Sequence, residues 1–132
     1  MGGGQLGRMF VHAAQAMGYK VMVLEPAADC PAGHAADKLL VADYTNPTAL
    51  KNTAQQCVAV TTEFENVPAQ TLDALEALGV YVAPRSDSVS IAQNRIAEKN
   101  FLATWKSETN IGPAPHFVIE HDADIANAPA EL

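Results

Sequence analysis

Three glycines near the start of the chain have the spacing of an anion-binding turn. Gly2, Gly4 and Gly7 fit the pattern G-x-G-x-x-G, and a helical pattern follows directly. Glycine lets the backbone approach a ligand closely, and the first amides of a helix point at any anion placed there. Glu25 ends the next apolar run, where dinucleotide-binding enzymes keep an acid for the ribose. The pattern fits either a nicotinamide site or a tight turn that only packs a helix against a strand.

Two carboxylates flank an aromatic residue in the segment 61–68, which follows an apolar run. Ligands of open α/β sheets bind just past the carboxyl ends of such strands. With the alternating geometry of an extended chain, Glu63 and Glu65 face one side and Phe64 the other. A carboxylate at such a crevice can accept hydrogen bonds from a substrate amine. The alternative is that these glutamates are solvated or cap the helix expected near Pro68.

Two basic residues stand one helical turn apart in the segment 90–102. Arg95 and Lys99 share a helix face, and the planar guanidinium of Arg95 suits a phosphate. The alternative is a solvated surface, with Glu98 as the neighbour of Arg95.

Hydrophobic periodicity indicates the elements that must position these residues. Three- and four-residue spacing predicts a first helix with one apolar face, made of Leu6, Met9, Phe10, Ala13, Ala14 and Met17. Further helices are expected over 46–56, where Asn46 and Pro47 form a helix start, from Pro68 to about 78, and over 86–104 in two pieces. Short strands are expected over 20–25, 39–41, 57–62 and 80–82, and an extended segment over 112–120.

This alternation predicts an α/β fold with a Rossmann-like parallel sheet and flanking helices. Such a sheet begins with a strand that leads into the glycine turn, so we expect the first strand to be missing here. Its neighbours would then lack a partner, and we expect poor solubility or dimerisation through the bare sheet.

The composition of the chain argues against several classes of partner and cellular location. The chain has 132 residues, with 8 Lys and Arg against 15 Asp and Glu, a formal charge of -7. The absence of a basic stripe argues against a nucleic-acid partner. Cys30 and Cys57 lack metal-ligand spacing and are expected to be reduced thiols. Because no signal peptide or membrane-spanning run is evident, we expect a cytoplasmic protein that does not bind membranes.

Taken together, the segments 2–9, 62–68 and 91–102, with the pair Asp43-Tyr44, resemble the N5-carboxyaminoimidazole ribonucleotide synthetase family of ATP-grasp enzymes. The resemblance covers nearly all of residues 2–120. It implies a pre-ATP-grasp domain over 1–90, followed over 91–132 by a linking helix and the truncated start of an ATP-grasp domain. It also implies a ligase of de novo purine biosynthesis that joins bicarbonate to the amine of 5-aminoimidazole ribonucleotide. ATP and Mg²⁺ would be required, carboxyphosphate is the usual proposed intermediate, and the full-length protein would be a homodimer.

The same resemblance assigns site residues. Gln5, Leu6 and Glu63 would bind the ribonucleotide and Arg95 would contact ATP, with Glu65 and Lys99 as second-rank candidates. The catalytic and magnesium-binding residues of the family lie beyond residue 132, so we expect this polypeptide alone to be inactive. Three other interpretations remain: a sister ATP-grasp ligase acting on another small amine, a nicotinamide-binding oxidoreductase domain, and a non-catalytic binding or regulatory module.

Overall fold

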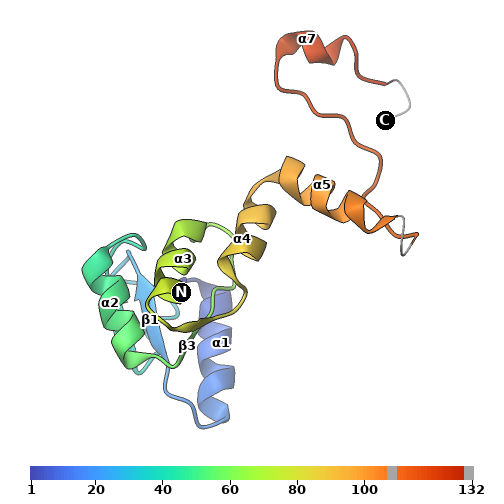
Figure 1. Cartoon of the computed structure of the whole chain (residues 1–132). Helices are drawn as coiled ribbons and strands as arrows, with labels where there is room; N and C mark the ends of the chain where they lie inside the picture. The colour runs from blue at the N-terminus through green and yellow to red at the C-terminus, as the bar shows by residue number, and fades with distance from the viewer. Residues whose placement is uncertain (107–109, 130–132) are drawn as a thin grey trace. The chain divides into compact units, whose positions relative to one another are not determined.

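Strands and helices alternate along the chain in the computed structural model, which describes residues 1–106 and 110–129 (Figure 1). The chain divides into two units, Met1–Ser90 and Ile91–Leu132. Within the described residues, the strands all belong to the first unit. The α/β class expected from the sequence is therefore confirmed.

The strands form two separate parallel pairs instead of one sheet. β1 (Met22–Glu25) pairs with β2 (Lys38–Val41), and Met22 lies opposite Lys38. β3 (Ala59–Val60) pairs with β4 (Tyr81–Val82), and Ala59 lies opposite Tyr81. In the part of the chain that the structure describes, no hydrogen-bonded ladder joins the two pairs. The parallel direction was predicted correctly, and the sheet is split because no described strand pairs with both β1 and β3.

Helices cover both faces of β1. α1 (Gln5–Ala16) lies on one side, and α2 (Pro47–Gln56) and α3 (Ala69–Ala77) lie on the other (Figure 1). Val23 is 4% exposed and packs in a cluster with α1, whereas Leu24 is 2% exposed and packs in a cluster with α2 and α3. Successive residues of a strand point to opposite faces, so this single strand connects two apolar cores.

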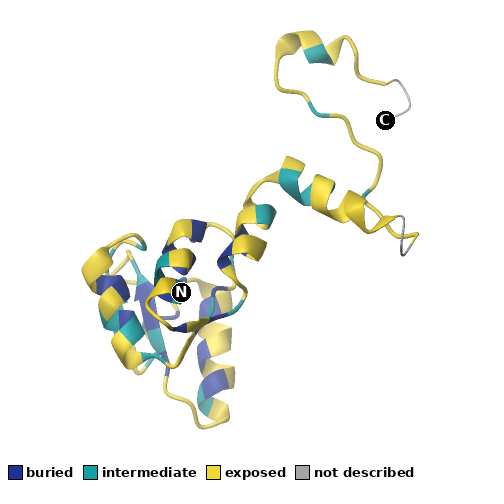
Figure 2. Ribbon diagram, in the orientation of Figure 1, coloured by how far each residue is buried: buried dark blue, intermediate teal, exposed yellow. Residues whose placement is uncertain are grey.

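The buried face of α1 differs from the one predicted. Gly7, Val11 and Ala14 are the buried residues of the helix, and Val11 is fully buried. Leu6, Met9, Phe10, Ala13 and Met17 are exposed instead, although they share helical spacing. Figure 2 shows the buried stripe running along the side of α1 that meets the rest of the first unit. Periodicity identified the helix, but α1 has more apolar residues than its sheet contact covers.

The starts of the next two helices agree with the sequence. Asn46 caps α2, because its side-chain oxygen accepts a hydrogen bond from the Ala49 amide at 3.0 Å, and Pro47 is the first helical residue. Pro68 directly precedes α3, whose residues Leu72 and Leu75 are fully buried.

The predicted break in the last long helix is confirmed. α4 (Ser86–Gln93) and α5 (Arg95–Thr104) are separated by Asn94, whose side chain accepts hydrogen bonds from two amides of α5. Residues 112–120 contain no helix or strand, and α7 (Asp122–Ile125) follows. No described residue from position 91 onward is buried. The helices in the described ranges are all too short or too polar to span a membrane.

Candidate functional site

The glycine turn, the end of β1 and the loop after β3 meet at one edge of the first unit. Two backbone hydrogen bonds hold them together. The Gly2 amide donates to the Leu24 carbonyl at 3.3 Å, and the amino group of Met1 donates to the Thr61 carbonyl at 2.5 Å. Because parallel strands end at the same edge, side chains that follow β1 and β3 gather there. Of the candidate site residues, Gln5, Leu6 and Glu63 belong to these segments.

Glu25 is the organising side chain of the turn. One carboxylate oxygen accepts hydrogen bonds from the Gly3 amide at 2.8 Å and from the Tyr44 hydroxyl at 2.5 Å. The other oxygen accepts from the Ala27 amide at 3.2 Å. Burial and the hydrogen bond to Glu25 raise the pKa of Tyr44 above its usual range, so the hydroxyl stays protonated and continues to donate. Three segments of the chain are thereby tied to one carboxylate.

Gly3 is the tightest position of the turn, although it lies outside the G-x-G-x-x-G pattern. A Cβ atom there would lie 2.5 Å from the Glu25 Cγ and 2.8 Å from the Cys30 Sγ. Gly2 has a φ of +103°, and a Cβ on Gly7 would lie 2.7 Å from the Gly2 carbonyl oxygen. A Cβ on Gly4 would meet no atom within 4 Å. The sequence signal for Gly3 is the uninterrupted run of three glycines, of which the G-x-G-x-x-G pattern uses only Gly2 and Gly4.

These contacts argue against the nicotinamide interpretation. The Glu25 carboxylate accepts hydrogen bonds from within the turn, whereas a ribose-binding acid must accept from the ligand's hydroxyl groups. The side chains of Glu25 and Cys30 also fill the space beside Gly3. The turn therefore packs α1 against β1, which is the structural alternative that the sequence left open.

Gln5 and Leu6 occupy the first turn of α1, at the accessible side of the glycine turn. Both residues are exposed, and no side chain caps the helix at Gly4. The first amides of a helix have no partner within the helix itself, so this end of α1 can donate to a ligand.

Glu63 lies beside the opening glycines of the chain. Its Oε1 atom is 3.1 Å from the position that a Cβ on Gly2 would occupy. The segment is a turn rather than the extended chain that was expected, and the Thr62 hydroxyl stabilises it by donating to the Phe64 carbonyl at 3.0 Å. The Phe64 ring packs edge-on against Tyr44, with 6.5 Å between centroids. Glu63 and Glu65 are both exposed, whereas Phe64 is half-buried. The turn therefore directs the two carboxylates toward solvent and the ring toward Tyr44.

Arg95 and Lys99 belong to the second unit, on α5. The Arg95 guanidinium forms an ion pair with Glu98, and its side chain is 73% exposed. This is the neighbour anticipated in the solvated alternative. Within the described residues, no three His, Cys, Asp or Glu side chains gather as possible metal ligands. Cys30 and Cys57 are free thiols.

Comparison with known proteins identifies the family. The family model of the ribonucleotide synthetase preATP-grasp domain matches residues 1–93. The N5-carboxyaminoimidazole ribonucleotide synthase of Brucella melitensis is 38% identical over 128 residues, which cover 97% of this chain and 34% of that protein.

Two solved structures support this match. The crystal structure of N5-carboxyaminoimidazole synthetase from Staphylococcus aureus complexed with ADP is 35% identical, with a TM-score of 0.85 over 96% of this chain and 32% of that one. The enzyme from Aspergillus clavatus, in complex with ADP and 5-aminoimidazole ribonucleotide, is 31% identical, with a TM-score of 0.70 over 80% of this chain and 28% of that one. The chain spans about a third of the length of the curated relatives it matches. It belongs to the ribonucleotide synthetase preATP-grasp domain family.

Proposed function

We propose that this chain is the preATP-grasp part of an N5-carboxyaminoimidazole ribonucleotide synthetase. The reaction would join bicarbonate to the exocyclic amine of 5-aminoimidazole ribonucleotide, with ATP hydrolysed to ADP and phosphate and Mg²⁺ as the metal. The observation that carries the proposal is the position of Glu63 beside the glycine turn, in a chain whose relatives bear this enzyme's name. Residues 91–132 would begin the ATP-grasp domain.

The proposed substrate site uses the open end of α1 and the exposed carboxylate of Glu63. The Gln5 side chain offers both a donor and an acceptor, and the backbone amide of Leu6 offers a donor. Glu63 would accept a hydrogen bond from the substrate amine and fix its direction. Holding two reactants in place is worth roughly 7–11 kcal/mol in well-oriented reactions, so positioning alone is a sufficient role for these residues.

Arg95 is proposed to bind a phosphate of ATP, and Lys99 and Glu65 are second-rank site candidates without an assigned ligand. Its ion pair with Glu98 is exposed, and such pairs contribute only about 0–1 kcal/mol. Exchanging Glu98 for a phosphate would therefore cost little. A guanidinium can then form two parallel hydrogen bonds with the phosphate oxygens.

A chimera tests these roles. It joins this chain to the remaining part of the Brucella melitensis relative, and turnover is measured as ADP formation with ATP, bicarbonate and 5-aminoimidazole ribonucleotide. We expect Glu63→Gln to raise the KM for the ribonucleotide about tenfold, because a hydrogen bond to a charged group contributes about 1.5–3 kcal/mol. The KM for ATP should not change. Glu65→Gln is the matched control, and we expect it to change the ribonucleotide KM less than threefold.

Two results would contradict the assignment. The first is an equal effect of Glu63→Gln and Glu65→Gln on the ribonucleotide KM. The second is a chimera that hydrolyses ATP faster with another small amine than with 5-aminoimidazole ribonucleotide, which would favour a sister ATP-grasp ligase. We expect Arg95→Met to raise the KM for ATP and not that for the ribonucleotide. The 132-residue chain alone is expected to produce no ADP above a control without enzyme.

The surroundings of the enzyme are part of the proposal. We expect the full-length protein to be a cytoplasmic homodimer whose partners are its small-molecule substrates. The excess of 15 acidic over 8 basic residues argues against a nucleic-acid or anionic-membrane partner. Light scattering of the chimera would test the dimer.

A further inference from the structure

Tyr44 lies between the two parts of the proposed substrate site. It belongs to the loop that joins β2 to α2, and β2 runs parallel to β1, so both strands end at the same edge. The Thr71 hydroxyl of α3 donates to the Tyr44 carbonyl at 3.1 Å, and Thr71 is buried. The half-buried Tyr44 side chain also packs against the core that α2 and α3 share. The core therefore fixes the place of this residue.

The hydroxyl of Tyr44 reaches the glycine turn through Glu25. It donates to the carboxylate oxygen that also accepts from the Gly3 amide, at 2.5 Å and 2.8 Å respectively. A free glutamate side chain has several rotamers, and hydrogen bonds from two separate segments hold this one in a single arrangement. Without the hydroxyl, Glu25 would lose the donor that comes from the loop after β2. Gln5 and Leu6 follow the glycines directly, so a looser turn would displace the proposed substrate donors.

The ring of Tyr44 reaches Glu63 through Phe64. The two rings meet edge to face, with 6.5 Å between their centroids and 62° between their planes. The Phe64 ring also lies against the glycine turn, because a Cβ on Gly2 would be 3.3 Å from it. Glu63 directly precedes Phe64, and its Oε1 atom would be 3.1 Å from the same Cβ. The contacts of the Phe64 ring therefore fix the backbone that carries the Glu63 carboxylate.

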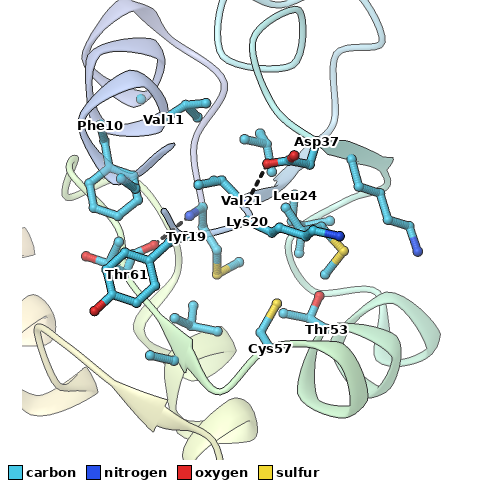
Figure 3. A pocket seen from close by; sticks show the side chains of 18 of the residues that line it. Phe10, Val11, Tyr19, Lys20, Val21, Leu24, Asp37, Thr53, Cys57 and Thr61 are labelled. Atoms are coloured by element: carbon cyan, nitrogen blue, oxygen red, sulfur yellow. Dashed lines mark hydrogen bonds between the residues drawn. The ribbon is translucent and has the colours of Figure 1, made fainter. Parts of the chain in front are cut away.

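Together these contacts close a ring around the edge of the first unit. Its members are Gly2, Phe64, Tyr44, Glu25 and Gly3. Displacing one member strains the contacts on both of its sides, so a closed ring holds its members more firmly than an open chain of contacts. A backbone hydrogen bond from Met1 to the Thr61 carbonyl adds a second link between the turn and the segment of Glu63. Figure 3 shows Thr61 at the cavity that β1 and β3 line.

We propose that Tyr44 is a positioning residue of the substrate site, which sets the glycine turn through its hydroxyl and the Glu63 loop through its ring. This inference rests on the proposed function. Tyr44 needs no contact with the ribonucleotide, because Glu25 and Phe64 carry its effect to the binding residues. A binding group is held within about 0.5 Å of its productive position only when packing and hydrogen bonds lock the residues behind it. The two effects can be separated, because the hydroxyl can be removed without the ring.

The test uses the chimera described above and measures the KM for the ribonucleotide and the KM for ATP. Tyr44→Phe removes only the hydroxyl, and we expect it to raise the ribonucleotide KM about threefold. Tyr44→Leu removes the hydroxyl and the ring, and it should raise this KM about tenfold. The ATP KM should not change in either variant. Tyr81→Phe is the matched control, because Tyr81 is exposed on β4, and it should change neither KM.

Combination with Glu63→Gln separates the two routes. Phe64→Leu breaks the ring contact without touching Tyr44, and we expect it to raise the ribonucleotide KM about threefold. In the Glu63→Gln background it should raise this KM less than about 1.5-fold, because the ring acts through Glu63. Tyr44→Phe should keep its effect of about threefold in that background, because the hydroxyl acts through the turn. Phe64→Leu also carries the test of the ring if Tyr44→Leu does not fold.

Loss of stability alone has a different kinetic signature. Asn46→Ala removes the α2 cap, which lies outside the ring of contacts, and should lower at most the kcat through a smaller folded fraction. Tyr44 variants that likewise lower the kcat and leave the ribonucleotide KM unchanged would overturn the proposal. So would a full effect of Phe64→Leu in the Glu63→Gln background.

The same measurements distinguish this inference from the proposed function. If Glu63→Gln itself leaves the ribonucleotide KM unchanged, the proposed substrate role of Glu63 is wrong, and the positioning role is wrong with it. If Glu63→Gln raises this KM but shows no coupling to Phe64→Leu, the substrate role stands and the positioning role alone is overturned.

Discussion

Adding a single methyl group at Gly3 tests whether the glycine turn is closed by packing. The new Cβ would lie 2.5 Å from the Glu25 Cγ and 2.8 Å from the Cys30 Sγ, whereas carbon atoms prefer a separation of about 3.5–4.0 Å. Glu25 would have to move by about 1 Å, which lengthens its hydrogen bonds with Gly3 and Tyr44. Overpacking costs about 1–3 kcal/mol, and a weakened hydrogen bond to a charged group adds about 1 kcal/mol. We therefore expect Gly3→Ala to lower the free energy of unfolding by roughly 2–4 kcal/mol.

Gly4→Ala is the matched control for this substitution. A Cβ on Gly4 meets no atom within 4 Å, and the φ of Gly4 is -71°, which any residue can adopt. The expected loss is below about 1 kcal/mol, from the weaker capping of α1 by alanine. Urea unfolding followed by circular dichroism would measure both variants. Equal losses of unfolding free energy for Gly3→Ala and Gly4→Ala would refute the reasoning. Such a result would mean that there is room for a Cβ atom beside Gly3.

Three further predictions concern individual polar contacts. Tyr44→Phe should lower the free energy of unfolding by about 1.5 kcal/mol, because it leaves the ring in place and removes one donor to Glu25; a loss below about 0.3 kcal/mol would contradict this. Asn46→Ala should lower the free energy of unfolding by about 1 kcal/mol, because α2 loses its cap. Asn46→Asp keeps an acceptor for the Ala49 amide and should retain most of the stability in thermal melts. Backbone and side-chain hydrogen bonds hold the pKa of Asp37 below its usual range, so its stabilisation should be complete above about pH 3.9 and disappear as the pH falls through the lower native-state pKa. Asp37→Asn should flatten this part of the unfolding curve against pH, and an unchanged curve would refute the contribution.

The helices were predicted well, because a residue that caps or breaks a helix acts on the backbone within a few positions of itself. Asn46 and Pro47 begin α2 as predicted, and the helix expected over 86–104 in two pieces divides at Asn94. The parallel direction of the strands also followed from the alternation of strands and helices. The sequence placed Glu63 just past the carboxyl end of a strand, and in the structure its carboxylate lies beside Gly2.

Contacts between distant residues escaped the sequence analysis. Tyr44 and Glu25 are 19 residues apart, and no spacing rule links a hydroxyl to a carboxylate at that separation. The face of α1 was assigned wrongly because helical spacing cannot decide which of several apolar stripes meets the sheet. The segment after β3 was expected to continue as a strand. Thr62 turns it instead, by donating to the Phe64 carbonyl.

The continuous apolar run of β1 does not by itself fix the position of the strand along its axis between the helices. A slip by one residue would exchange Val23 and Leu24 between the two cores and still place an aliphatic side chain in each. The polar contacts at the two ends of the run do not tolerate such a slip. A shift of ~3.3 Å would break both the hydrogen bond from the Val21 amide to Asp37, at 2.8 Å, and that from Gly3 to Glu25. The hydrogen bonds of Asp37 and Glu25 therefore fix the register of β1, which hydrophobic burial alone would leave undetermined.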